Sequence, residues 1–168
     1  MARTLDFRIT TFWWVPGDAG ITNPDAISAA TLTAARNITT YLHPSTEINT
    51  APSDTVSERG IDDYANVVTP IIGNYTGTLV GFRDLLAGVP TANDLLTLVG
   101  SAAGALGWLV RREGFASTAA AAATQKVDAF KFALDNPQKS AGKGDGMLKV
   151  TIPLHAQGVF RIETALVA

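Results

Sequence analysis

The chain has 168 residues, of which 46% are hydrophobic and 17% charged, with a formal net charge of −2 and no cysteine. This length fits one domain, 1–168, with a core of its own, and the composition is that of a folded protein. The absence of cysteine excludes disulfides, thiolate catalysis and zinc–cysteine sites, and the thirteen Lys and Arg residues are scattered, which argues against nucleic-acid binding through a basic stripe.

No segment predicts export or membrane insertion. The N-terminal stretch 1–14 alternates in polarity and lacks the apolar region of a signal peptide. The longest mostly apolar run without a charge, 95–110, is shorter than the ~18–20 residues that span a membrane. We therefore expect a soluble protein that functions without secretion.

Alternation of apolar and polar residues is the dominant pattern along the chain, and it predicts about seven strands and a mainly β protein. The predicted strands are Arg8–Val15, Asn37–His43, Asn74–Arg83, Gly107–Glu113, Lys126–Asp135, Met147–His155 and Val159–Val167. A turn at Gln157-Gly158 is expected to join the last two. Pro153 predicts that its strand lies at a sheet edge, or that the position of its missing N–H faces solvent.

One helix is predicted in the middle of the chain. The sequence Thr91-Ala92-Asn93-Asp94 resembles a capping box, and apolar residues then follow at helical spacing from Leu95 to Leu106. Gly104 or Gly107 is expected to end the helix.

Three stretches lack periodicity. The longest, Pro44–Gly73, is polar, and a loop of this length in a small domain usually contacts another molecule. Ala116–Thr124 is alanine-rich and predicts either a short helix or a loop. Asn136–Gly146 predicts a glycine-rich hairpin connection, and Gly142–Gly146 within it lacks the spacing of a phosphate-binding loop.

The titratable residues do not form a recognisable catalytic or metal-binding motif. His43 and His155 are far apart in the sequence, without metal-ligand spacing. The acidic cluster of Asp54, Glu58 and the Asp62-Asp63 pair could bind Ca²⁺ or act in acid–base chemistry, but a solvated or salt-bridging face is favoured. We expect no catalytic residue, no metal and no cofactor, and hence a protein that is not an enzyme.

Two groups of large side chains could contact a ligand or partner. The Arg111-Arg112-Glu113 segment could stack on a nucleic-acid base, although a strand end with an ion pair is favoured. Trp13, Trp14 and Trp108 are expected to pack in the core, and a subunit interface is the main alternative.

An ordered set of segments resembles the major tail tube proteins of long-tailed bacteriophages, in particular those of actinobacterial phages. The set begins with ATLTAARNITTYL and DTVSERGIDDYANVVTPIIGNYTGTLVGFRD, then continues through a short helix into GWLVRREG, a strand ending in ALDNPQ, and a final β-hairpin. It covers the chain from about Trp14 to the C-terminus. The run Ala119–Ala123 departs from the pattern, where the family has a more polar connection.

The resemblance implies a β-sandwich or partial barrel flanked by one helix, without catalytic activity. It implies six copies in a ring, with sheets of neighbouring copies joined into an inner β-barrel and rings stacked into a tube. Double-stranded DNA would pass through the lumen without specific binding, and a tape measure protein and other tail proteins would be partners. Assembly would take place in the host cytoplasm, with the protein ending in the virion and no membrane involved.

The family's long loop between subunits and rings corresponds to about 44–73. The residues expected at the subunit or ring interface are Asp54, Glu58, Arg59, Asp62, Asp63 and Tyr64, together with Trp13 and Trp14. Ion pairs at such an interface would set register more than affinity. Two alternatives stay open: an inner-tube protein of a contractile tail or injection system, and a monomeric β-sandwich that binds a ligand through its tryptophans.

Overall fold

The computed structural model describes residues 9–58, 67–140 and 147–168, with the backbone alone for 53–58 and 67–73. Ten strands lie in these ranges: β1 (Thr11–Pro16), β2 (Arg36–Asn37), β3 (Glu47–Glu58), β4 (Val67–Phe82), β5 (Leu85–Leu86), β6 (Val89–Pro90), β7 (Leu106–Arg112), β8 (Lys126–Leu134), β9 (Gln138–Lys139) and β10 (Lys149–Ala165). The described helices are α1 (Ala29–Ala34), α2 (Leu95–Val99) and the 3₁₀ turns η1 (Asp18–Gly20) and η2 (Thr39–Tyr41).

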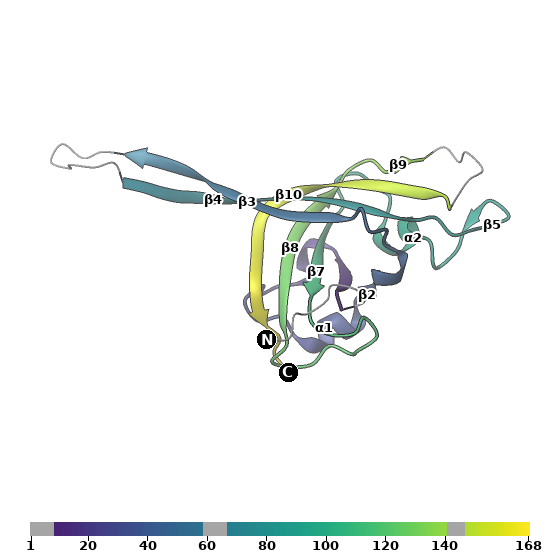
Figure 1. Cartoon of the computed structure of the whole chain (residues 1–168), viewed down its shortest axis with the longest axis horizontal. Coiled ribbons are helices and arrows are strands. Elements are labelled where there is room, and N and C mark those ends of the chain that lie inside the picture. The colour runs from purple at the N-terminus through teal and green to yellow at the C-terminus, as the bar shows by residue number, and fades with distance from the viewer. Residues whose placement is uncertain (1–8, 59–66, 141–146) are drawn as a thin grey trace, which may run out of the picture.

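One antiparallel sheet contains most of the strands, in the order β2-β1-β7-β8-β10-β4-β3, with β9 also paired to β10. The long strand β10 bends in its middle, so that its first part pairs with β4 and its second part with β8 (Figure 1). Register shifts interrupt the β8 pairing on both sides of Phe160 and Arg161, and such bulges bend strands. The bend lets two parts of the same sheet face each other.

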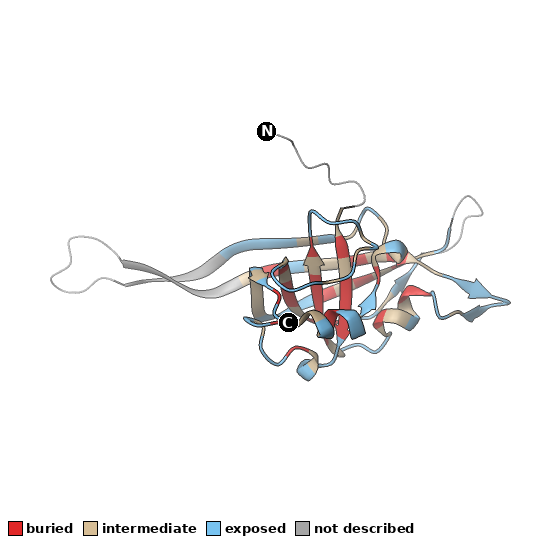
Figure 2. Cartoon of the chain, turned by 90° about the horizontal axis from the view of Figure 1, so that it is seen from below, coloured by how far each residue is buried: buried red, intermediate tan, exposed pale blue. Residues whose placement is uncertain are grey.

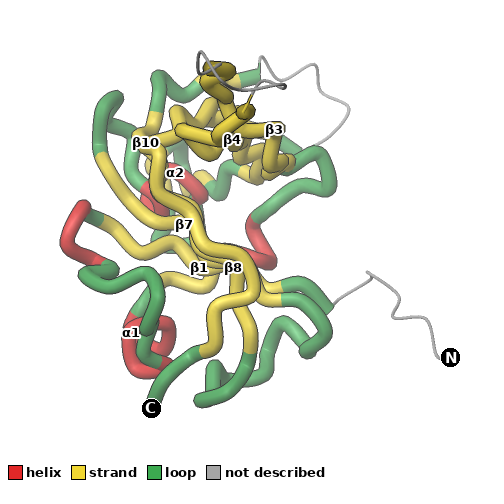
Figure 3. Tube along the Cα trace, turned by 90° about the vertical axis from the view of Figure 1, so that its left-hand side faces the viewer, coloured by secondary structure: helices red, strands yellow, loops and turns green. Residues whose placement is uncertain are grey.

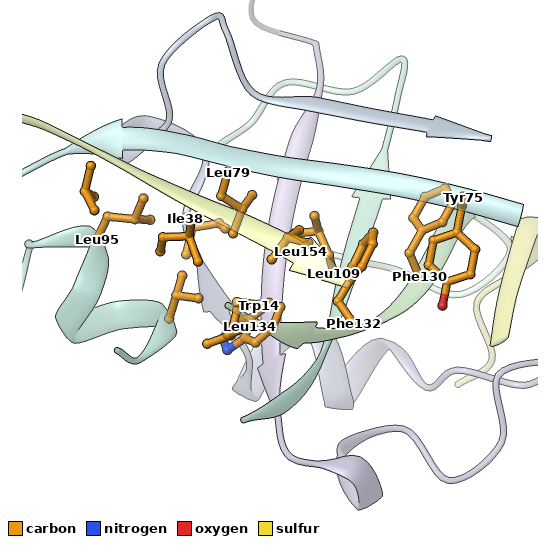
Figure 4. Close-up of a cluster of buried hydrophobic side chains, with 13 residues drawn as sticks. Trp14, Ile38, Tyr75, Leu79, Leu95, Leu109, Phe130, Phe132, Leu134 and Leu154 are labelled. Atoms are coloured by element: carbon orange, nitrogen blue, oxygen red, sulfur yellow. The ribbon is translucent and has the colours of Figure 1, made fainter. Parts of the chain in front are cut away.

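The main core fills the space between these two parts of the sheet (Figure 4). Its thirteen buried side chains come from β1, β4, β7, β8, β10, α2 and the start of η2: Trp14, Ile38, Tyr75, Leu79, Leu95, Val99, Leu109, Phe130, Phe132, Leu134, Val150, Ile152 and Leu154. A second core lies on the other side of β1, β7 and β8, under α1 and the C-terminal residues, and contains Trp13, Leu32, Trp108 and Leu166. Alternate residues of the central strands therefore belong to two different cores, and Figure 2 shows the buried residues along these strands.

The predicted fold class is confirmed: the protein is mainly β and sandwich-like. β1, β7 and β8 lie within a few residues of their predicted positions. The prediction of a single helix is wrong, because two α-helices are present in the described ranges. The additional one, α1, is capped by Ser28, whose hydroxyl accepts a hydrogen bond from the Thr31 N–H at 3.0 Å. No described helix has the length and apolar character needed to cross a membrane.

The predicted strand Asn37–His43 is wrong beyond its first residue. β2 ends at Asn37, and the chain then forms the 3₁₀ turn η2. The Asn37 side chain accepts a hydrogen bond from the Thr39 N–H, and the Thr39 hydroxyl accepts one from the Phe12 N–H at 2.8 Å. These local side-chain bonds compete with a strand ladder despite the alternating sequence.

The predicted turn at Gln157-Gly158 is also wrong, because both residues lie inside β10, at its bend. Gly158 has a φ of 72° there, a conformation that favours glycine. The edge prediction for Pro153 is wrong as well, since β4 pairs with β10 at this point, with Thr78 opposite Pro153. On the other side of β10, the Pro153 carbonyl accepts a hydrogen bond from the Asp135 N–H, just beyond the end of β8. The N–H that proline lacks would face this same side, where β8 ends and no ladder bond is needed.

The central helix α2 is shorter than predicted. It begins after Asp94 and ends at Gly100, whose φ is 108°, rather than at Gly104 or Gly107. The Asp94 side chain does not cap this helix, because it binds Arg83 instead. The predicted helix start near Thr91 is therefore wrong in detail, although a helix is present.

The alanine-rich segment Ala116–Thr124 is a loop without a regular helix, one of the two predicted outcomes. The buried guanidinium of Arg112 holds it, since it donates hydrogen bonds to the carbonyl oxygens of Ala116, Ala119 and Ala120 at 2.8–3.3 Å. Arg112 also lies over the ring of Trp13, 4.9 Å from its centroid. The position predicted to be a strand end is therefore a structural anchor.

Candidate self-assembly surface

A two-stranded ribbon formed by β3 and β4 extends from the body of the protein (Figure 1). β10 pairs with β4 only as far as Gly77, opposite Leu154, and the outer part of β4 pairs with β3 alone in the described ranges. The predicted loop 44–73 is therefore wrong in its structure, because Glu47–Glu58 and Val67–Gly73 are strand. Both outer edges of the ribbon carry backbone groups that a further strand could pair with.

Close packing fixes the base of the ribbon to the main core. A Cβ atom at Gly77 would lie 2.8 Å from the ring of Phe132, so only glycine allows β4 to approach β8 this closely. On β3's side, the Thr46 hydroxyl donates to the Val80 carbonyl at 2.9 Å and accepts from the Val80 N–H at 3.1 Å. The ribbon is thus held in one orientation where it leaves the body (Figure 3).

Tyr75 links the ribbon to the bend of β10. Its hydroxyl accepts a hydrogen bond from the Gln157 N–H at 2.9 Å and lies within reach of the carbonyl oxygens of Val159 and Lys131. Its ring packs among Phe130, Phe132 and Phe160. Burial raises the pKa of the Tyr75 hydroxyl above its ordinary value, so the group stays neutral and serves as a structural bond.

An open groove of about 790 Å³ lies beside the start of β3. Its lining includes Phe12, His43, Ile48 and Arg111, and no catalytic arrangement is visible in the described part of the chain. The His43 ring lies 2.9 Å from the Ser45 hydroxyl, but the Lys149 ammonium lies 3.1 Å from its other nitrogen. Both ring nitrogens of His43 therefore have a polar neighbour within the single chain.

The other sequence candidates make structural pairs. His155 pairs with Asp135 at 3.0 Å on the surface, and Arg111 pairs with Asp128 at 2.7 Å, as the ion-pair interpretation of that segment predicts. Across the described residues, no three potential metal-ligating side chains come together. The favoured interpretation of Arg111–Glu113 as a strand end with an ion pair is confirmed for Arg111.

The residues predicted at a subunit interface fall into three groups. Asp54 and Glu58 lie on β3, the edge strand of the ribbon, opposite Ile72 and Val67 of β4. Arg59, Asp62, Asp63 and Tyr64 lie outside the described residues. Trp13 and Trp14 are 5% and 1% exposed in the single chain, which favours core packing over an interface role for these two side chains.

Sequence reasoning missed the strand β3 and therefore the open edges of the ribbon. Its residues 47–52 are mostly exposed and show no alternation of the kind that a buried face imposes, and Pro52 argues against a central strand. One signal was available: Thr50, Thr55 and Val56 are β-branched, as are many residues of β4.

Two comparisons with known proteins bear on this surface. A family model described as "Phage tail tube protein" matches residues 1–168, the full length of the sequence. No curated protein matches the chain.

Proposed function

The chain belongs to the phage tail tube protein family, and we propose that its copies assemble into hexameric rings that stack into a tube through which double-stranded DNA passes. The family establishes a structural role in the virion tail. The ring, the stacking and the passage of DNA are the proposal, along with assembly in the host cytoplasm on a tape measure protein.

The observation that carries the proposal is the ribbon with its open edges. An isolated two-stranded hairpin is marginally stable in water, so a ribbon of this length gains stability from a further strand. A neighbouring copy can supply that strand, and repetition around a ring would leave no sheet edge exposed. Such a contact is heterologous, because it joins two different surfaces of neighbouring copies. It closes into a ring when the rotation from one copy to the next divides a full turn into a whole number of steps.

Charge supports a conduit rather than a DNA-binding protein. The net charge is −2, and five lysines and arginines of the described part form ion pairs, among them Arg111–Asp128, Arg161–Asp25 and Lys126–Glu163. A lumen that neutralised many phosphates would hold the duplex in place. We therefore expect weak, salt-insensitive contact with DNA.

Removal of the ribbon tests the proposal. We would replace Pro52–Gly73 with Asn-Gly, because Ala51 faces Asn74 in the ladder and Asn-Gly forms a two-residue hairpin turn. The main core is left intact, so the variant should fold as a monomer with a near-native circular dichroism spectrum, whereas the full-length chain should form rings or tubes in negative-stain electron microscopy. Tubes of the truncated variant would contradict the role of the ribbon.

A further inference from the structure

A second, smaller hairpin lies at the other end of the molecule from the ribbon (Figures 1 and 2). β5 and β6 pair through Leu85–Pro90 and Leu86–Val89, joined by the two-residue turn Ala87-Gly88. Both turn residues have positive φ, 51° and 83°, as a type I′ turn requires. We call this segment, Leu85–Pro90, the apolar finger.

The tip of the finger exposes large apolar side chains. Leu86 is 75% and Val89 65% exposed, and the neighbouring Met147 is 72% exposed. Of the eight large hydrophobic residues that are exposed in the described ranges, five gather here: Leu85, Leu86, Val89, Met147 and Leu148. The Arg83 N–H donates to the Leu148 carbonyl at 2.9 Å, which places the two segments side by side. Apolar residues concentrated in this way mark a contact surface.

The base of the finger is closed by a buried ion pair. The Arg83 guanidinium donates to the Asp94 carboxylate at 2.5 Å, and the two side chains are 8% and 0% exposed. The same carboxylate oxygen accepts from the Asp84 N–H at 3.0 Å, and the Thr91 hydroxyl donates to the Asp84 carboxylate at 2.6 Å. The finger is therefore anchored to the body, although its tip contributes nothing to the core of the single chain.

We propose that the apolar finger is a docking element for a neighbouring copy of this chain along the tube. This inference rests on the proposed function. The proposed function uses the ribbon for contact within the ring, so contact between stacked rings needs a different surface on each copy. The ribbon and the finger lie at opposite ends of the long axis of the molecule, and the finger carries the apolar side chains that such a contact would bury (Figure 1). An anchored base limits the positions of the finger and so reduces the entropy lost when the contact forms.

The test compares the wild-type chain with the variant Leu86→Ser/Val89→Ser. Because both side chains are exposed and the Arg83–Asp94 base is untouched, the variant should keep the wild-type melting temperature. Its critical concentration for tube formation, measured by light scattering and electron microscopy, should rise roughly tenfold or more, since burial of each side chain contributes to the contact. Leu86→Met/Val89→Ile keeps the apolar surface and should assemble as the wild type does.

A second readout follows burial directly. The chain has no cysteine, so Leu86→Cys can carry a polarity-sensitive fluorophore at a unique position. Its emission should shift to the blue when tubes form, whereas the same label on Thr33→Cys, exposed on α1, should report no shift of that size. Ser variants that assemble at the wild-type concentration would overturn the finger's role and leave the tube intact. Wild-type protein that stays monomeric would contradict the proposed function, and this inference with it.

Discussion

Arg112 shows how one buried charge can organise a whole loop. It is 0% exposed, and its partners are the carbonyls of Ala116, Ala119 and Ala120, the Gln125 amide oxygen and the Thr11 hydroxyl. Burial lowers the pKa of the guanidinium from its ordinary value, yet arginine stays charged in proteins. The carbonyl dipoles compensate for its lost hydration.

Replacement of this side chain should therefore be costly. Arg112→Met leaves several loop carbonyls without their donor, and we expect the free energy of unfolding to fall by about 2–4 kcal/mol in urea denaturation. Arg111→Met is the matched control, because Arg111 is partly exposed and its pair with Asp128 should contribute ~1 kcal/mol or less. Equal losses for the two variants would contradict the anchoring role of Arg112.

The ion pair between Asp25 and Arg161 should make the stability of the folded protein depend on pH. The hydrogen bond from the Arg161 guanidinium lowers the pKa of the Asp25 carboxyl below its ordinary value of about 3.9. Because the pKa is lower in the folded state, the ion pair stabilises the folded state when the pH is above the ordinary pKa. This stabilisation is lost as the pH falls through the folded-state pKa. Asp25→Asn should lower the melting temperature at pH 7, and the difference should shrink below about pH 4. A constant difference from pH 7 to about pH 3 would contradict the assignment.

At the scale of elements, the bend of β10 depends on Tyr75. The hydroxyl satisfies backbone groups on both sides of Gly158, at Gln157 and Val159, where the ladder to β8 is interrupted. Buried backbone groups left without partners are costly.

Tyr75→Phe should therefore reduce the free energy of unfolding by about 1–3 kcal/mol and increase amide exchange near residues 157–159. Tyr41→Phe is the matched control, because the Tyr41 hydroxyl makes one hydrogen bond to the Asn93 side chain near the surface, at 3.1 Å. We expect a smaller loss for that variant and no change in exchange at the bend. The opposite order of the two losses would show that the bend does not depend on Tyr75.

The sequence predicts some elements far better than others, for a physical reason. β7 and β8 pack in the body, where alternate residues such as Leu109 and Val110 face the two cores. Burial therefore selects the residue types along these strands, and the sequence reveals them. β3 leaves the body, and its residues 47–52 are mostly exposed, so burial imposes no alternation on them. The strand at Asn37–His43 was predicted from alternation alone, while local hydrogen bonds of Asn37 and Thr39 decide the structure there.

The candidate site was predictable in position but not in form. The unusual length and polarity of 44–73 mark it as a contact region in the sequence. That it contains an edge strand depends on pairing between Glu47–Glu58 and Val67–Thr78, whose outer parts extend beyond the body (Figure 1). Helix α1 has only six residues, too few for a periodic signal, although Ser28 is a typical cap.

At the scale of the whole molecule, the protein has a body with two cores, a ribbon with open edges at one end and an apolar finger at the other (Figure 1). The proposed tube requires two properties of its subunit, and this arrangement offers a surface for each. Its sheet must be able to continue into a neighbour, and its two ends must make different contacts. In the proposed tube, neighbouring copies would cover both the ribbon edges and the finger.

The most direct test is a cryo-electron microscopy reconstruction of tubes assembled from the full-length chain. The account predicts six copies around an open lumen, with an edge of the β3–β4 ribbon about 4.8 Å from a strand of the neighbouring copy, the spacing of paired strands. A reconstruction in which the ribbon edges face solvent, or in which no lumen exists, would contradict it.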